Sequence, residues 1–397
     1  MIAAESLLIL ASIFLLVPVS VLLTQVLLAF TFRPAQLSPC DQRPRIAVLM
    51  PAHNEAAGIS EALAAVKHQL HPGDRLLVVA DNCSDNTSDV AILSGAEVVE
   101  RTEVERIGKG YALSRGLHHL ASDPPEVVII VDADCVVESG AIDKLVSLCI
   151  SSGRPVQALY RMYCHRDAGH SARIAEFGWV VKNYVRPLGF LRLGMPCQLM
   201  GTGMAFPWRV LASADLANNN LVEDMKLGID LAVAGYPATF CPSALVTSTF
   251  PSHKNAALIQ RTRWEHGHLS LIMQEFPRLI ARSIVIRRSE AFGLALDLAV
   301  PPLALLGILV TSTFALSATA ACFGMTWVPL ALSMIALAML AIAILLAWQG
   351  WGRAILTLSD LLSLPVYAIM KIPLYARFWT ARQKNWIRTE RDLQDRG

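Results

Sequence analysis

Val127-Val-Ile-Ile-Val-Asp-Ala-Asp134 is a run of five β-branched residues that ends in two carboxylates. A run of this kind is typical of a strand buried on both faces, as strands are in parallel sheets. Two similar runs come earlier, at Arg45–Met50 and Arg75–Ala80, and helix-like stretches such as Ala56–Gln69 and Lys109–Ala121 lie between the runs. This alternation predicts an α/β domain with a mainly parallel sheet.

Polar side chains follow the predicted strands. Pro51-Ala-His-Asn-Glu55 comes after the first strand and Asp81-Asn-Cys-Ser-Asp85 after the second. Asp132-Ala-Asp134 comes after the fourth, where Glu97–Glu100 counts as a short third strand. Ligands of open α/β sheets bind beyond the carboxyl ends of the strands, so we expect a polar ligand site at this edge.

The residues of these clusters are not expected to share one role. Asp85 and Asn86 are better explained as turn and helix-start residues, because short polar side chains satisfy the unpaired N–H groups there. Glu55 and Asp81 are expected to contact the ligand.

Two long stretches of the chain carry no charged side chain. Ser6–Phe32 has 27 residues, and about 20 suffice to cross the hydrocarbon core of a bilayer as a helix. A cleaved signal peptide is disfavoured, because the run is too long and follows Glu5 rather than Lys or Arg. The stretch between Asp297 and Arg353 can hold two spans joined by a turn near Gly324-Met-Thr-Trp327.

The next apolar segment, Ala354–Met370, is short and contains Asp360 and Pro365. Charge at mid-bilayer is costly, so we expect an interfacial or re-entrant helix here. Basic residues flank the apolar segments, and the positive-inside rule then predicts a multi-pass protein of the bacterial inner membrane whose middle part and tail are cytoplasmic. They are Arg33, Arg43, Arg45, Arg278, Arg282, Arg287, Arg288, Arg377, Arg382, Lys384, Arg388 and Arg391.

Composition limits the other classes of protein. The net charge is only +2, and we expect no nucleic-acid partner. The eight cysteines form no C-x-x-C pair and no set at zinc spacing. A disulfide framework and a structural zinc site are therefore disfavoured.

Asp132 and Asp134 carry the first chemical signal. The pattern D-x-D is frequent by chance, but a place directly after a buried strand makes it informative. Mg²⁺ takes oxygen ligands, commonly one or two carboxylates together with substrate phosphates. A cation held here would neutralise a nucleotide diphosphate and stabilise the charge of the departing group, so we expect Mg²⁺ or Mn²⁺.

Two further polar motifs follow. Glu223-Asp224 opens a helix-like stretch, where acids are commonly just partners of the helix dipole. About 35 residues later, Gln260-Arg-Thr-Arg-Trp264 has helical spacing, which places Gln260, Arg263 and Trp264 on one face. Arg suits a diphosphate through its rigid fork of donors, and Trp offers a flat platform for a sugar ring.

The order of these parts, with apolar segments on both sides, resembles the processive-type family 2 glycosyltransferases, the relatives of cellulose, hyaluronan and poly-N-acetylglucosamine synthases. The resemblance implies a GT-A type fold and inverting transfer of a sugar from a nucleotide diphosphate, UDP above all. It implies that Asp134 binds the metal, that Asp132 lies nearer the nucleotide, and that Asp224 is the general base with Glu223 in support. The family pattern at the last pair is T-E-D, so Val222 is a departure that removes one hydroxyl.

The same resemblance assigns the remaining site residues. Gln260 and Arg263 are expected to bind the donor diphosphate, and Trp264 is expected to bind the acceptor. Gly201-Thr-Gly203 resembles the segment before the acceptor-binding helix, which places Gly201 and Thr202 on the acceptor, although a simple turn can have the same sequence.

The donor site is completed by residues near the sheet edge. In Gly108-Lys-Gly-Tyr-Ala-Leu113, glycine allows close approach of the backbone and Lys109 can reach a phosphate or base. The spacing is not that of a Walker loop. Pro51, Glu55 and Asp81 are expected on the donor nucleotide.

The sequence thus predicts three regions: an N-terminal transmembrane helix (1–33), a cytoplasmic GT-A domain with interfacial helices at its end (34–290), and a C-terminal membrane segment with a basic tail (291–397). The expected partners are a nucleotide-sugar donor, a glycan or lipid-linked acceptor, the bilayer, and polysaccharide export or assembly proteins. Exopolysaccharide synthesis competes with glycosylation of a membrane lipid such as ceramide, diacylglycerol or a polyprenyl phosphate. An inactive sugar-nucleotide sensor or scaffold is disfavoured, because all four carboxylates are present.

Overall fold

The computed structural model describes residues 2–33, 43–103, 105–165, 167–217, 220–286 and 288–382. The predicted basic residues Arg287, Lys384, Arg388 and Arg391 lie outside the described residues. The described chain forms two compact units, each built from separate stretches of sequence. The sheet unit contains residues of 33–165 and 196–267, and the apolar unit contains residues of 2–32, 167–195 and 268–382.

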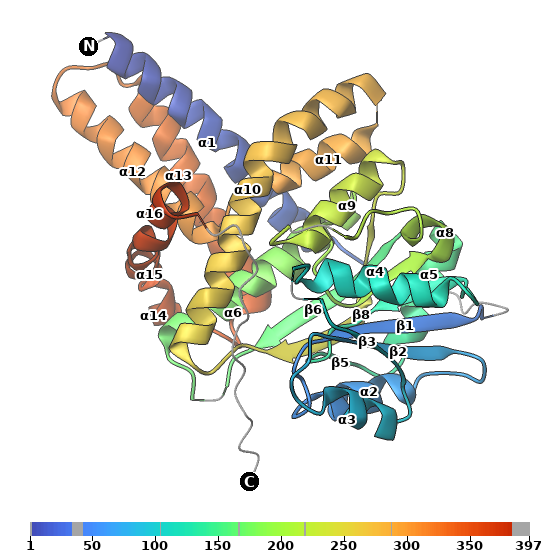
Figure 1. The fold of residues 1–397 in the computed structure, drawn as a ribbon. Coiled ribbons are helices and arrows are strands. Elements are labelled where there is room, and N and C mark those ends of the chain that lie inside the picture. Colours follow the sequence, from blue (N-terminus) through green and yellow to red (C-terminus); the bar gives the residue numbers. More distant parts are fainter. Residues whose placement is uncertain are drawn as a thin grey trace. The chain divides into compact units, whose positions relative to one another are not determined.

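The sheet unit is built on a mixed sheet, with eight strands in the described chain (Figure 1). Their order across the sheet is β3-β2-β1-β4-β7-β6-β8-β5. They are β1 (Ile46–Ala52), β2 (Arg75–Asp81), β3 (Glu97–Arg101), β4 (Val127–Ile130), β5 (Val136–Val137), β6 (Val156–Tyr163), β7 (Met204–Pro207) and β8 (Thr239–Thr249).

The first four strands are parallel, and they are the four predicted from the apolar runs. Every residue of β4 is buried, as expected of β-branched residues in a strand covered on both faces. β7 runs antiparallel to β4 and β6, whereas β8 runs parallel to β6 and antiparallel to the short β5. The α/β class with a mainly parallel sheet is confirmed.

Helices cover both faces of this sheet. α2 (Ile59–Lys67) and α3 (Thr87–Leu93) lie on one face and α4 (Lys109–Leu120) on the other (Figure 1). The switch of face follows from topology, because the chain moves outward from β1 to β3 and then returns to β4. Gly116 allows α4 to approach the sheet, since a Cβ there would lie 2.4 Å from Leu49 Cδ1. The unit also holds α5 (Ala141–Ser152), α8 (Trp208–Leu211), α9 (Glu223–Val233) and the first part of α10 (Lys254–Ile286).

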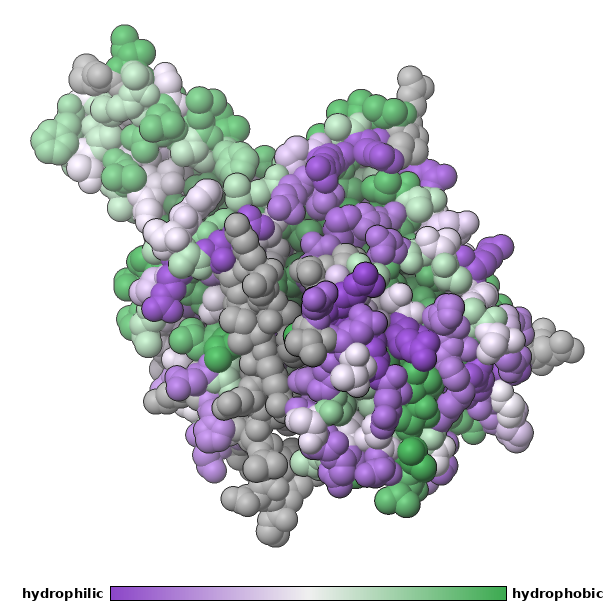
Figure 2. Space-filling model, viewed as in Figure 1, coloured by the Kyte–Doolittle hydropathy of each residue, from purple (hydrophilic) through white to green (hydrophobic). Residues whose placement is uncertain are grey.

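The apolar unit is helical. It contains α1 (Ile2–Ala29), α6 (His170–Val180), η1 (Val181–Val185), α7 (Arg186–Leu191), the rest of α10, α11 (Ser289–Leu298), α12 (Leu303–Cys322), α13 (Val328–Ala347), η2 (Trp348–Gly352), α14 (Leu358–Leu361), α15 (Leu364–Met370) and α16 (Ile372–Thr380). α1 packs against α12 and α13. Figure 2 shows hydrophobic residues gathered over α1 and α12.

Three helices of this unit are long and apolar enough to cross a membrane, namely Ile2–Ala29, Leu303–Cys322 and Val328–Gly352. They fall where the charge-free stretches predict them, and the chain turns at residues 323–327 between the second and third. Ala354–Met370 forms two short helices, α14 and α15, instead of one long one. Thr357 caps α14 in a capping box, in which the carboxylate of Asp360 accepts the backbone N–H of Thr357 (2.9 Å).

A buried polar network lies inside the apolar unit. Gln25 of α1 donates to Asp297 of α11 (2.6 Å). Arg186 of α7 donates to Gln25 (3.0 Å) and to the same Asp297 oxygen (2.8 Å). Polar groups away from water are costly unless they are paired, and here each satisfies another. The network ties the segment 167–195 to α1 and α11.

Candidate active site

Asp132 and Asp134 lie just beyond the end of β4, where the sequence places them. Asp134 is exposed and Asp132 is half-buried. The backbone N–H of Asp132 donates to Thr202 Oγ1 (3.1 Å). Single ligand atoms of Asp132, Asp134 and Cys135 lie within 4.8 Å of one another. Burial, and then the charge of Asp134, raise the pKa of the Cys135 thiol well above its usual range, so it stays protonated. The two carboxylates are therefore the groups that fit a hard divalent cation.

Lys109 is the first residue of α4, and its side chain reaches Asp132. Its ammonium forms an ion pair with Asp132 and donates to the carbonyl oxygen of Gly201 (2.7 Å). Burial alone would lower the pKa of Lys109, but the charges of Asp132, Glu223 and Asp224 outweigh burial and raise it. Lys109 is thus a permanent cation among carboxylates.

The backbone of the segment around Gly201 is held by hydrogen bonds to a buried glutamine, Gln157. Gln157 of β6 accepts the N–H of Met200 (2.8 Å) and donates to the Thr202 carbonyl oxygen (2.9 Å). Gly203 has φ +63°, and a Cβ there would lie 2.8 Å from Ala158 Cβ, so no larger residue fits without movement.

The two predicted acceptor residues of this segment differ in their placement. Thr202 is fully buried, and its hydroxyl accepts the backbone N–H of Asp132, so its contact in the structure is with the segment after β4. Gly201 lies beside the acids, since a Cβ on it would be 3.3 Å from Asp224 Oδ2.

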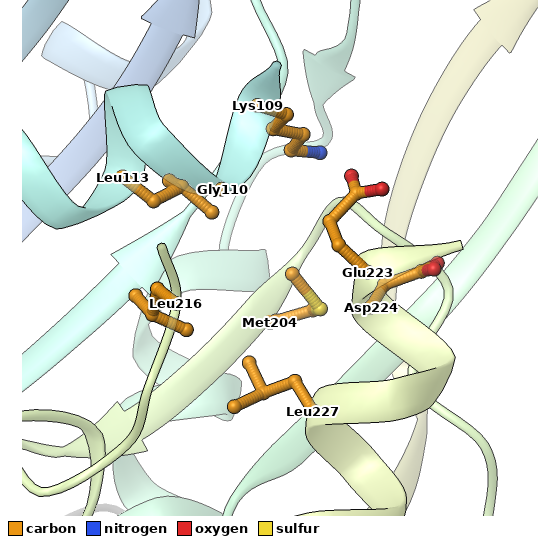
Figure 3. A pocket seen from close by; sticks show the side chains of 8 residues that line it. All are labelled: Lys109, Gly110, Leu113, Met204, Leu216, Glu223, Asp224 and Leu227. Carbon is orange, nitrogen blue, oxygen red and sulfur yellow. The ribbon is translucent and has the colours of Figure 1, made fainter. Parts of the chain in front are cut away.

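Glu223 and Asp224 open α9, as the sequence predicts for a helix start. Figure 3 shows the Glu223 carboxylate pointing toward the Lys109 ammonium. A small pocket lies beside them, lined by Lys109, Gly110, Leu113, Met204, Leu216, Glu223, Asp224 and Leu227. Burial, and then the neighbouring charge of Asp224, raise the pKa of Glu223 to about 7, against the opposing effects of Lys109 and Arg263.

The Gln260–Trp264 run lies on the part of α10 that belongs to the sheet unit. All three predicted side chains, Gln260, Arg263 and Trp264, are half-buried. Arg263 is close enough for its charge to act on Glu223. One turn further on, Gly267 packs on the residue before the acids, since a Cβ there would lie 2.7 Å from Val222 Cγ1. The apolar Val222 therefore fits its place against α10.

The predicted nucleotide residues lie at the ends of β1 and β2. Pro51 lies inside β1, which extends two residues further than predicted and ends at Ala52. Asp81 ends β2 and is buried in an ion pair with Arg101 (2.5 Å). Burial raises the pKa of Asp81, and the Arg101 partner opposes that rise. Glu55 follows β1, and its N–H donates to Thr87 (2.8 Å).

The loop after β2 has the turn chemistry predicted for Asp85. Its carboxylate accepts the N–H of Thr87 at the start of α3 (3.1 Å) and the N–H of Ala56 (3.2 Å). Asn54 and Asn82 have positive φ, 55° and 52°, which Asn tolerates better than most residues.

Sequence reasoning missed three residues that shape this site: Arg101, Gln157 and Cys135. Arg101 stacks over the Tyr111 ring (5.5 Å) while it pairs with Asp81. No motif marks Arg101 or Gln157, although an Arg at the end of an apolar strand and a Gln within one are unusual enough to predict a buried partner.

Comparison with known proteins identifies the class. A family model described as "Glycosyltransferase like family 2" matches residues 44–267, which is more than half of the 397 residues. The chain belongs to this family. This family 2 glycosyltransferase also has the expected GT-A type fold. It superposes on a mannosyltransferase from Pyrobaculum calidifontis, solved in complex with GDP-Man and Mn²⁺, with a TM-score of 0.56 and 20% identity over 92% of this chain and 98% of that one.

Relatives by sequence agree with this assignment. YdaM of Bacillus subtilis, named a probable glycosyltransferase, is 26% identical over 256 residues, which are 58% of this chain and 57% of that protein. The match thus spans little more than half of that relative. An uncharacterized glycosyltransferase of Mycobacterium tuberculosis is 30% identical over 190 residues, 42% of this chain and 82% of the relative.

Proposed function

We propose that this glycosyltransferase transfers a sugar, with inversion, from a nucleotide diphosphate donor to a glycan acceptor in the synthesis of a cell-surface polysaccharide. UDP is the proposed nucleotide. The observation that carries the proposal is the meeting, within the sheet unit, of Asp132, Lys109, Glu223 and Asp224 around the Gly201 carbonyl.

The donor end of the site is assigned to the D-x-D pair and to basic residues. Asp134 and Asp132 would hold Mg²⁺ or Mn²⁺, which supplies charge neutralisation for the diphosphate. Arg263 and Gln260 would orient the same diphosphate from α10, and Asp81, Pro51 and Glu55 would contact the donor nucleotide. The mannosyltransferase with this fold was solved with GDP-Man and Mn²⁺, which supports a nucleotide-sugar and metal site of this kind.

The acceptor end is assigned to the acid pair. Asp224 takes the proton of the acceptor hydroxyl, and that oxygen attacks the anomeric carbon opposite the leaving diphosphate. Glu223 stands beside Asp224, and burial together with the charge of Asp224 raises the pKa of Glu223 to about 7, so Glu223 holds a proton more readily than an ordinary glutamate. Trp264 and Gly201 would carry the acceptor sugar.

A second candidate is transfer to a membrane lipid. Three helices able to cross a bilayer favour it, because they would hold the protein in the membrane that contains such an acceptor. We propose that these helices lie in the bacterial inner membrane with the sheet unit in the cytoplasm. Export or assembly proteins are proposed partners of the first function only.

One experiment separates these functions. The full-length protein in lipid nanodiscs is incubated with a panel of radiolabelled UDP- and GDP-sugars, with Mn²⁺ or with EDTA, and the products are divided into lipid-soluble and aqueous polymeric fractions. The proposal expects Mn²⁺-dependent transfer from a UDP-sugar into the polymeric fraction. Label in the lipid fraction would support the second candidate, and transfer that persists in EDTA would contradict the metal assignment.

Matched variants make this experiment specific. Asp224→Asn should remove transfer. Asp230→Asn, on the exposed face of the same helix, should not change it. Equal activity of the two variants would remove Asp224 from the role of base.

A further inference from the structure

Lys109 makes two contacts that join the donor and acceptor ends of the site. Its ammonium pairs with Asp132, which follows β4, and donates to the carbonyl oxygen of Gly201. The Cα of Gly201 lies beside Asp224, since a Cβ there would be 3.3 Å from Asp224 Oδ2. The side chain is largely buried, with 17% of its surface exposed. A buried ammonium is stable only among anionic or carbonyl partners, so these contacts fix the position of Lys109.

The charge around Lys109 is unbalanced. Asp132, Asp134 and Asp224 bring three negative charges, and Glu223 adds a fourth when it is ionised, against the positive charges of Lys109 and Arg263. A divalent cation would restore the balance, but Asp132 is already paired with Lys109. A metal ion arriving alone must therefore compete with Lys109 for one of its two carboxylates.

A donor changes this competition. Its diphosphate is an anion with several oxygen acceptors, and an ammonium binds such a group as a compact point charge. Lys109 then loses its ion pair with Asp132 but gains contacts with phosphate oxygens, and these new contacts offset the lost ion pair.

We propose that Lys109 is an internal counter-ion, which occupies Asp132 in the donor-free protein and passes to the donor diphosphate when metal and nucleotide bind together. This inference rests on the proposed function, because it assumes that Asp132 and Asp134 receive the metal that accompanies a diphosphate. Two consequences follow. Metal binds weakly without nucleotide, and each ligand strengthens the binding of the other by the same factor.

The test is a calorimetric titration of the full-length protein in detergent with Mn²⁺, in the absence and in the presence of saturating UDP. In the wild type, UDP should tighten Mn²⁺ binding. In Lys109→Met, Mn²⁺ alone should bind about tenfold more tightly than in the wild type, since a hydrogen bond to a charged group is commonly worth that factor or more. With UDP present, the same variant should no longer bind Mn²⁺ more tightly than the wild type. The factor by which UDP raises Mn²⁺ affinity should therefore be smaller in the variant.

Two variants control for charge and for folding. Lys109→Arg keeps the positive charge and should bind Mn²⁺ alone as the wild type does. Lys144→Met removes a half-buried lysine of α5 that also donates to a carbonyl oxygen, that of Ser243 (2.9 Å), and should change neither titration. Size-exclusion profiles of all variants show whether each is folded.

Several outcomes would overturn the proposal. They are equal or weaker binding of Mn²⁺ alone in Lys109→Met, the same change in Lys109→Arg or Lys144→Met, and a wild type in which UDP leaves Mn²⁺ affinity unchanged. The last result needs no variant, so it decides even if Lys109→Met does not fold. A wild type that couples Mn²⁺ and UDP but transfers no sugar would contradict the proposed function and leave this inference intact.

Discussion

Replacement of Glu223 by Gln is expected to stabilise the folded protein at pH 8 and to leave its stability nearly unchanged at pH 4. The pKa of Glu223 rises from an ordinary 4.5 to about 7, because the site is buried and holds Asp224. A group whose folded pKa is raised contributes stability below its unfolded pKa and loses it as pH rises through the folded pKa. The wild type should therefore lose stability between about pH 4.5 and pH 7.

The size of this loss follows from the shift. A change from 4.5 to about 7, at about 1.4 kcal/mol per pKa unit, gives about 3–4 kcal/mol as an upper bound. Glu223 keeps part of its surface in water, so a smaller value is expected. Gln has nearly the same shape and cannot ionise, and the variant avoids the cost of a charge beside Asp224.

The assay is thermal unfolding in detergent at both pH values, followed by tryptophan fluorescence. Glu223→Gln should raise the melting temperature by several degrees at pH 8, since about 1 kcal/mol moves it by about 2–4 °C in chains of 150–250 residues. Glu61→Gln, at an exposed carboxylate on α2, is the matched control and should change neither value. A Glu223→Gln protein that melts below the wild type at pH 8, or that differs equally at both pH values, would refute the reasoning.

The other predictions concern ligands and turnover. Asp134→Asn should bind Mn²⁺ more weakly while the protein stays folded, and unchanged Mn²⁺ affinity by calorimetry would count against a metal role. Asp224→Asn should keep UDP affinity and lower turnover by roughly 10²–10⁴-fold, as loss of a general base commonly does, whereas lost UDP affinity with normal turnover would make it a binding residue. Arg263→Lys keeps the charge but loses the fork of donors, so UDP-sugar affinity should fall. Trp264→Ala should spare UDP binding and donor hydrolysis but reduce transfer, and equal loss of all three would indicate a packing role.

The strands and membrane-type helices were predictable because each depends on local composition. β-branched runs such as Val127–Val131 have few alternatives to a buried strand, and a stretch such as Ser6–Phe32 without charge is long enough to cross a bilayer. The position of Asp132 and Asp134 at a strand end followed directly from the first of these signals.

The mutual contacts of the site were not predictable in the same way. Lys109 was expected to bind a ligand. In the structure its ammonium forms an ion pair with Asp132 and a hydrogen bond with the carbonyl oxygen of Gly201, and both residues are distant in sequence. The partner of Asp81 is Arg101, twenty positions later in the next strand. Such pairs depend on which strands become neighbours, and the residues of a single sequence do not carry that information.

The membership of residues 167–195 in the apolar unit was equally unpredictable from the sequence. Their pattern is helical, and nothing in it distinguishes a helix of the sheet unit from one that packs with the long apolar helices. The decisive signal is Arg186, whose buried partners Gln25 and Asp297 are distant in sequence.

The scattered make-up of the apolar unit also has a consequence for how the protein can be shortened. The segment 167–195 belongs to this unit, and its helix α7 packs against α1, although it lies between strands of the sheet in the sequence. A Cβ on Gly189 would lie 1.9 Å from the Gln25 carbonyl oxygen, so α7 and α1 meet at backbone distance. A soluble fragment cut to residues 34–267 would keep α7 but lose that partner. It would expose an apolar helix and the unpaired charge of Arg186 in the middle of the catalytic segment, and such a fragment should aggregate unless 167–195 is replaced as well.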